Sequence, residues 1–273
     1  MTELLKIEWL KLKNYIAFKI MALFFIIGVF AINYIVYLVN KNIVNNVPGV
    51  GLLSFSPYNF ENTWQSTSYA TGFILILPSL LLMMLFTNEY TFKTHRQNII
   101  DGLSRQQFIN VKIVMALIFA VVSTILVFIT ALAFGFGSGT SFSFNGIVYV
   151  GYFFLKALSY NLIAILLSVL VKRTGFAIGV FFIYLGAENI ISQLLNVLSI
   201  KMKVENGSDW GNIGDYLPMN AADALLAFPP NPFKTMSKHI MPSDYTWLVL
   251  VFAIVYLALF YFWATKKFIN SDL

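Results

Sequence analysis

The run INVKIVMALIFAVVSTILVFITALAF, residues 109–134, carries a single charged residue, Lys112. A helix needs about 20 consecutive apolar residues to span the hydrocarbon core of a bilayer, so this run predicts a membrane-spanning helix. The whole chain has the same character, because 59% of its 273 residues are hydrophobic and 11% are charged. A soluble domain carries roughly 25% charged residues. The sequence therefore predicts an all-α, polytopic integral membrane protein.

Other apolar runs on both sides bring the prediction to six transmembrane helices in one transmembrane domain, residues 1–273. We expect the spans at about residues 17–39, 69–87, 109–134, 146–171, 174–198 and 245–264. Pro78 lies inside the second run and should kink that helix, because proline lacks an amide hydrogen. The first run follows a basic segment, as in a signal peptide, but it is too long and lacks a small-residue cleavage site. We therefore expect it to be retained as a span.

Lysine and arginine are distributed unevenly between the loops, and this distribution predicts the orientation. They gather before the first span, in the loop 88–108, at residues 172–173 and after the last span. The positive-inside rule then places both termini on the cytoplasmic side of the cell inner (cytoplasmic) membrane. We expect an N-terminal interfacial helix at about 2–14, or else a polar extension of the first span, and a large outer loop at 199–244. The net charge of +6 reflects this topology and does not indicate nucleic acid as a partner.

Several kinds of chemistry are excluded by residue content. The chain has no cysteine and two histidines, His95 and His239, so it has no disulfide, thiolate site or His-rich metal site. It also lacks a GxxxxGK[ST] phosphate-binding loop, so ATP would have to bind another chain. An intramembrane enzyme would need paired acidic and His residues within the spans, where Glu188 is the only acidic residue. We expect no catalytic residue, cofactor or metal in this chain.

The polar block NEYTFKTHRQNIIDGLSRQQF, residues 88–108, separates the second and third predicted spans. A Thr-x-x-Gln capping box beginning at Thr94 predicts a short helix over about 95–101. Gly102 is suited to the left-handed conformation that ends a helix. A second box, Ser-x-x-Gln, begins at Ser104 and opens the helix that becomes the third span. The block thus predicts two capped helices around a glycine corner.

Three apolar side chains, Ile99, Ile100 and Leu103, accompany the charges of this block. Two helical turns are not stable alone in water. They must pack against the membrane bundle, against another protein, or against both. Isoleucines on a charged cytoplasmic loop indicate a docking surface.

The block resembles the cytoplasmic loop between the second and third spans of type-2 ABC transporter permeases, the membrane subunits of export-type transporters. That family's pattern has an acidic-aromatic pair, a Gly-Thr, an Arg two positions on, a Gly-x-Ser-Arg corner and a Lys near the next span. The matching positions are Glu89-Tyr90, Thr94, Arg96, Gly102-Leu103-Ser104-Arg105 and Lys112. Lys93 departs from the pattern, since the family more often has Gly there, and this leaves the entry turn open.

With six spans and cytoplasmic termini, the resemblance extends over nearly the whole chain. It implies the permease subunit of an ATP-driven exporter, which forms the translocation pathway with a second copy or a related permease. Cytosolic ABC ATPase subunits would bind ATP and Mg and would receive a coupling helix. The residues implied in coupling are Glu89, Thr94, Arg96, Ile99, Ile100, Gly102, Leu103, Ser104 and Arg105. The alternatives are that the basic residues only set the topology and that Glu89 is a solvated helix end.

Two ionisable residues, Lys156 and Glu188, lie within the fourth and fifth predicted spans. Each is about ten residues from the outer end, so at about 1.5 Å per residue both lie roughly 15 Å deep. We predict a Lys156–Glu188 contact in the bundle interior, unless Lys156 snorkels outward. Asn189, Gln193 and Asn196 share a helical face beside Glu188, which either lines a substrate path or bonds to a neighbouring helix. An ion-coupled carrier acting alone would use the two charges as its coupling site.

Overall fold

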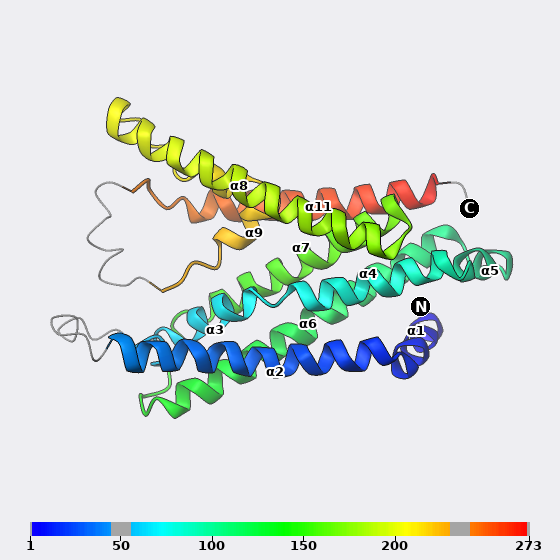
Figure 1. The fold of residues 1–273 in the computed structure, drawn as a ribbon, viewed down its shortest axis with the longest axis horizontal. Helices are drawn as coiled ribbons and strands as arrows, with labels where there is room; N and C mark the ends of the chain where they lie inside the picture. The colour runs from blue at the N-terminus through cyan, green and yellow to red at the C-terminus, as the bar shows by residue number, and fades with distance from the viewer. Residues whose placement is uncertain (1, 45–55, 230–240, 272–273) are drawn as a thin grey trace.

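The computed structural model describes residues 2–44, 56–229 and 241–271 as a bundle of long helices lying side by side (Figure 1). This described part of the chain is helical and contains no strand. Five of its helices are long and apolar enough to cross a membrane, and they are α2 (Ile16–Val39), α6 (Arg105–Gly137), α7 (Val148–Val171), α8 (Thr174–Asn206) and α11 (Thr246–Ile269). A bent pair, α3 (Thr63–Gly72) and α4 (Ile76–Thr91), makes the sixth candidate span. The predicted all-α, polytopic membrane architecture is confirmed at this level.

The second predicted span is broken, and the break does not lie at Pro78. The chain bends by 43° between α3 and α4, at residues 73–75. Pro78 is the third residue of α4, in the first turn, where a missing amide hydrogen costs little. It cannot donate to the carbonyl of Ile74, which instead accepts from the amide of Leu77 at 3.1 Å. Proline therefore sets where the second segment begins.

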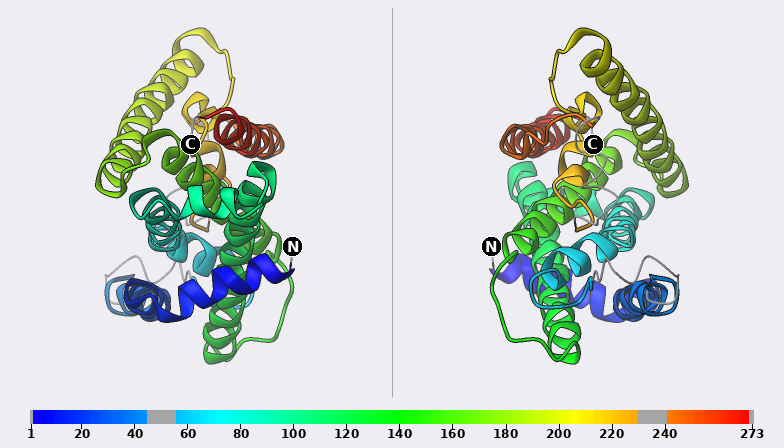
Figure 2. Two further views of the ribbon diagram at one scale, coloured as in Figure 1. Left: turned by 90° about the vertical axis from the view of Figure 1, so that its right-hand side faces the viewer. Right: turned by 90° about the vertical axis from the view of Figure 1, so that its left-hand side faces the viewer.

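The helix α7 lies at the centre of the bundle, in contact with α4, α6, α8 and α11 (Figure 2). Of its most apolar stretch 72% is buried, against 17% in α2 and in α8. A helix that is apolar all round and exposed on one side is expected where lipid, and not water, is the neighbour. The exposed apolar faces of α2 and α8 are thus available to lipid or to another membrane-embedded chain.

Three segments that are far apart in sequence lie at one end of the bundle: α1 (Thr2–Asn14), α5 (Thr94–Ile100) and the C-terminal end of α11 (Figure 1). The helix α1 matches the predicted interfacial helix in its bounds and is separated from α2 by Tyr15. At the other end, a short π-helical turn, η1 (Asn40–Val44), ends α2.

The fifth predicted span is too short, because α8 continues to Asn206. The predicted outer loop therefore begins with two more turns of helix. Beyond them, the 3-10 turn η2 (Ile213–Tyr216) and the helix α9 (Asn220–Ala224) fold back onto the bundle. Residues 230–240 of this loop lie outside the described residues.

Candidate functional site

The helix α5 and its corner follow the predicted design in part. Ser104 forms the predicted capping box, accepting from the Gln107 amide at 3.2 Å while its own amide donates to Gln107 Oε1 at 3.0 Å. Gly102 has a φ of +103°, as expected for the corner. The prediction of a first capping box at Thr94 was wrong, because Thr94 is the first residue of α5 and Lys93 occupies the N-cap.

Lys93 has a φ of +57°, in the left-handed region that glycine adopts at least cost. This is the position at which the type-2 permease pattern more often has Gly. The entry turn therefore keeps the backbone geometry that a glycine would favour, although its side chain departs from the pattern. A side chain in this conformation costs roughly 1–2 kcal/mol.

The apolar surface of α5 differs from the predicted set. Ile100 is 82% exposed, whereas Ile99 is half-buried. Leu103 packs against the main core, the largest cluster of buried apolar residues, which includes Phe86 and Phe108. Phe92, just before α5, is 72% exposed and was not singled out from the sequence, because an isolated aromatic residue between polar neighbours has no periodic signal. We call Phe92 and Ile100 the apolar tip of this loop. Arg96 is exposed on the same short helix.

A four-charge cluster, Glu8, Lys11, Glu89 and Lys112, joins α1 to α4 and α6. Lys112 Nζ contacts Glu8 Oε2 and Glu89 Oε1, both at 2.6 Å. Lys11 Nζ contacts Glu8 Oε1 and Glu89 Oε1, both at 2.8 Å. The side chains of Lys112 and Glu89 are only 4% and 8% exposed. Glu89 is therefore an interior bridging acid and not a solvated helix end.

The contacts of this cluster shift the pKa values of its two α1 residues, Glu8 and Lys11, in the direction that favours their ionised forms. Burial raises the pKa of Glu8, but Lys112 and Lys11 outweigh it and hold that pKa below 4.5. Burial lowers the pKa of Lys11, but Glu89 and Glu8 outweigh it and raise that pKa above 10.5. Leu12, on the same helix, is fully buried in the main core. The helix α1 is thus held by an apolar anchor and by two ionised residues.

Two further contacts tie the block 88–108 to the bundle. His95 Nδ1 lies 2.9 Å from the carbonyl oxygen of Glu89, and the His95 ring contacts that of Tyr90. Arg105 Nη1 donates to the carbonyl oxygens of Ile269, at 2.7 Å, and Ser271, at 3.0 Å. Arg105 therefore caps the last turn of α11 from the first turn of α6, so its side chain is engaged inside this chain.

The predicted Lys156–Glu188 contact is wrong for the described residues, in which Lys156 pairs with Asp223 of α9 at 3.1 Å. Tyr160 donates to the other Asp223 oxygen at 3.1 Å. Glu188 Oε1 accepts from the backbone amides of Met219, at 2.5 Å, and Asn220, at 2.9 Å. Lys156 of α7 and Glu188 of α8 thus both bind the segment 219–223, which belongs to the loop predicted to be the outer one.

The helix α9 begins in contact with α8. Asn220 is the first residue of α9, and its side chain donates to the Glu188 carbonyl oxygen at 3.2 Å. Ala221 and Ala222 are fully buried, so α9 is packed inside the bundle. This insertion was not visible from the sequence, since five residues are too short for a periodic pattern.

The three polar residues of the α8 stripe do not act together. Gln193 donates to Asn189 along the exposed face of α8 at 2.6 Å. Asn196 instead accepts from the Gly214 amide at 2.8 Å and donates to Asp215 at 3.2 Å. Any Cβ at Gly214 would collide with the carbonyl oxygen of Ser192, so the close approach of η2 to α8 requires glycine. Asn196 therefore bonds to the segment that follows α8.

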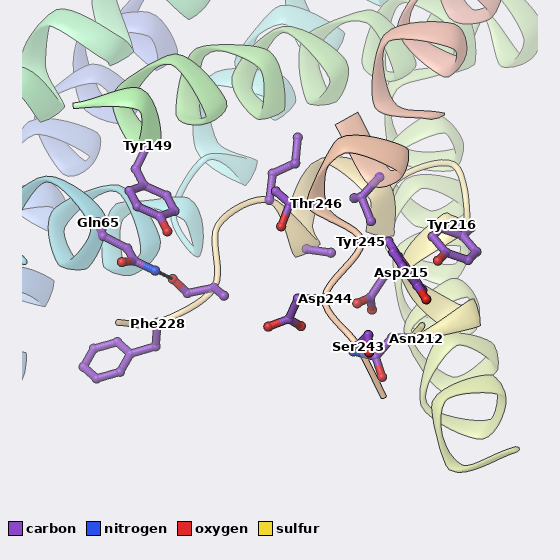
Figure 3. Close-up of a pocket in the computed structure, with 14 residues that line it drawn as sticks. Gln65, Tyr149, Asn212, Asp215, Tyr216, Phe228, Ser243, Asp244, Tyr245 and Thr246 are labelled. Atoms are coloured by element: carbon purple, nitrogen blue, oxygen red, sulfur yellow. Dashed lines mark hydrogen bonds between the residues drawn. The ribbon is translucent and has the colours of Figure 1, made fainter. Parts of the chain in front are cut away.

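Two cavities border the α9 segment. The outer one, of about 250 Å³, is lined by Asp215, Asp244 and three tyrosines, Tyr149, Tyr216 and Tyr245 (Figure 3). Its wall includes Ala227, whose carbonyl oxygen accepts from Gln65 Nε2 at 2.8 Å, drawn as a dashed line in Figure 3. The inner cavity, of about 220 Å³, is lined by Lys156, Glu188, Asn220 and Asp223 among others. Ala224 and Leu225 line the outer cavity, so residues of the α9 segment contribute to the lining of both.

Comparisons leave the chain without a matching family. No protein-family model matches it, and no curated protein sequence matches it at a significant level. Within the described residues, no group of three or more His, Cys, Asp or Glu side chains is placed to hold a metal ion. The resemblance to type-2 permeases thus depends on the residues from Glu89 to Lys112 and on the number of spans.

Proposed function

We propose that this chain is the membrane-spanning permease subunit of an ATP-driven ABC exporter in the cell inner membrane, with cytoplasmic termini. The observation that carries the proposal is α5, a short helix between two spans with an exposed apolar tip, Phe92 and Ile100. Such a tip costs free energy in water, and a groove in a cytosolic ATPase subunit would cover it. A second copy or a related permease would cover one of the exposed apolar faces and complete the pathway.

The anchoring of α5 supports a role in transmitting motion. On one side His95 contacts the Glu89 backbone, and on the other Ser104 caps α6. The four-charge cluster then links α4 and α6 to α1. A push on α5 by a closing ATPase would therefore reach three helices at once, as alternating access by rigid-body rocking requires.

The test is purification of the tagged chain from its native membrane in a mild detergent. We expect an ATP-hydrolysing subunit with a GxxxxGK[ST] sequence in stoichiometric amount, and its loss from Ile100→Asp. The matched control is Trp210→Ser, which removes an exposed apolar side chain from the other end of the chain's spans. An Ile100→Asp chain that keeps its ATPase, or a wild-type chain that transports without one, would contradict the proposal.

A second candidate is an ion-coupled carrier acting alone, which the buried Lys156–Asp223 pair and Glu188 favour. Buried charges at membrane depth often mark ion pathways. Reconstitution of the purified chain in vesicles separates the two functions. Transport driven by a proton or sodium gradient without ATP would support the carrier and exclude the exporter.

A further inference from the structure

We propose that a basic cavity beside α5 binds a phosphate group. The cavity lies where the end of α4 and the start of α5 meet the turn between α7 and α8. Its volume is about 440 Å³, within the roughly 300–1,000 Å³ of sites that enclose small ligands. The binding requires no ATPase, so it goes beyond the proposed transport function and does not rest on it.

The charge of the cavity favours an anion. Its lining contains no acidic residue and four basic ones, Lys93, Arg96, Lys172 and Arg173. Lys93 and Arg173 are exposed and form no ion pair within the described residues. The carboxylate of Glu89, close in sequence to the lining, is paired with Lys11 and Lys112 instead. A phosphate between the four cations would relieve their mutual repulsion and accept their N–H donors.

Two of the four cations stand where the backbone conformation is costly. Lys93 has a φ of +57° and Lys172 a φ of +59°, and among the described residues they are the only non-glycine residues with a positive φ. Glycine adopts this conformation at least cost, so the backbone does not favour lysine at either position. Strained positions of this kind gather at ligand-binding sites. Both line the same cavity, which indicates that their charges are needed there.

The wall that carries these charges is fixed in position. His95 lines the cavity and is 6% exposed, and its Nδ1 donates to the carbonyl oxygen of Glu89 at 2.9 Å. Lys172 Nζ lies over the ring of Tyr90, 5.6 Å from its centroid. A ligand therefore meets charges that are already arranged, and binding orders few further groups.

The position of the cavity makes a phospholipid head group the first source of this phosphate. Two spans end beside it, α4 at Thr91 and α7 at Val171, and α8 begins there at Thr174. Lipid phosphates lie at this level, just outside the hydrocarbon core. Leu170 and Phe176, within three residues of the lining, are 39% and 68% exposed. An acyl chain can lie against them while its phosphate occupies the cavity, as basic sites between spans bind anionic head groups.

The test uses the absence of cysteine from the chain. A single cysteine on the cavity wall, Val171→Cys, is labelled with the neutral reagent N-ethylmaleimide in phosphatidylcholine nanodiscs, which leave both bilayer faces accessible. Two titrations at constant ionic strength separate the sources of the phosphate. In one, phosphatidylglycerol replaces part of the phosphatidylcholine, and in the other inorganic phosphate replaces chloride. We expect phosphatidylglycerol to slow the labelling.

Charge variants in the Val171→Cys background show whether the cavity holds the ligand. Arg173→Gln should raise the half-protecting amount of ligand roughly fivefold or more, because it removes one attracting charge. Lys93→Asn should do the same without added backbone strain, since asparagine tolerates the left-handed conformation. Arg173→Lys keeps the charge and should keep most of the protection, which a misfolded variant would not. The matched control is Lys13→Gln, which removes an exposed lysine of α1 at the same end of the bundle and should change nothing.

The outcomes decide both the site and the source. Protection by phosphatidylglycerol that depends on Arg173 and Lys93 supports a lipid head group, and such protection by inorganic phosphate alone supports a soluble phosphate in the same cavity. No protection by either, or equal weakening by Lys13→Gln, would overturn the proposal. Equal slowing at Asn14→Cys, an exposed position on α1, would trace the effect to the charge of the bilayer surface and would overturn it too. Because no ATPase is present, these outcomes are independent of the co-purification that tests the exporter.

Discussion

Replacement of Lys112 by methionine should release α1 from the bundle. Methionine keeps most of the volume of the lysine stem but removes the charge that lies 2.6 Å from both Glu8 and Glu89. The two carboxylates are then left close together with only Lys11, whose side chain is 38% exposed, to neutralise them. Because Glu8 lies on α1 and Glu89 on α4, the repulsion between the two carboxylates pushes α1 away from α4.

The size of the effect follows from burial. Removing one partner of a buried ion pair costs about 3–5 kcal/mol, and the remaining Lys11 places this case near 3 kcal/mol. At about 1.4 kcal/mol per factor of ten, the fraction of chains with α1 released should rise roughly 100-fold. The global fold should survive, because the core around α7 does not depend on this cluster.

The assay is maleimide labelling of a single cysteine at Leu12, which is fully buried when α1 is docked. With rapid redocking the labelling rate reports the released fraction, so Lys112→Met should raise it about 100-fold over the Leu12→Cys parent. The control is Lys6→Met, which breaks an exposed pair with Glu3 worth about 0–1 kcal/mol. If Lys112→Met accelerates labelling no more than Lys6→Met does, the four-charge cluster does not hold α1.

The same labelling assay should depend on pH in two directions. The pKa of Glu8 is held below 4.5, so its stabilisation of α1 is complete above pH 4.5 and is lost as the pH falls through the folded-state value. The pKa of Lys11 is raised above 10.5, so its contribution is complete below pH 10.5 and is lost as the pH rises through the folded-state value. The labelling rates are first corrected for the fraction of the cysteine that is thiolate at each pH. A corrected rate that does not change at either pH limit would contradict this account. Gly214→Ala should lower the free energy of unfolding by about 1–3 kcal/mol, because the new Cβ would collide with α8. The control is Gly179→Ala, since a Cβ at this helical position meets no atom of the described residues within 4 Å. Equal melting temperatures for the two variants would refute the contact. Gly102→Val strains a corner with φ of +103° and should leave membrane insertion intact while uncoupling ATP hydrolysis from transport; normal transport with full ATPase stimulation would show that the corner has no coupling role.

The spans could be predicted because the signal for them is local. An apolar run such as 109–134 needs no tertiary information, since the bilayer sets its length. The Ser104 capping box and the Gly102 corner likewise depend only on residues that are close in sequence. The error at Thr94 arose because a Thr-x-x-Gln pair occurs often by chance, and only the backbone angles decide which residue is the cap.

The partners of the charged residues could not be predicted. Lys156 and Glu188 do line the same cavity, but Lys156 pairs with Asp223, which lies more than thirty positions beyond Glu188 in the sequence. Glu8 and Lys11 were expected to lie on an interfacial helix, and nothing local showed that they would reach Glu89 and Lys112. Partners of buried charges are chosen by how the helices pack, and packing is not encoded in the spacing of residues along one helix.

The small helix α9 is bound by polar contacts to two different spans. Asp223 is held from α7, by Lys156 and Tyr160, while the amides before it are held from α8, by Glu188. If α8 slides against α7 by one helical turn, about 5.4 Å, α9 cannot keep its contacts to both helices, because each contact is only about as long as a hydrogen bond. We expect α9 to leave its place or to turn when these spans move, and this would change the lining of both cavities. The segment that lines both cavities is thus bound to two spans at once, so a relative movement of these spans acts on it directly.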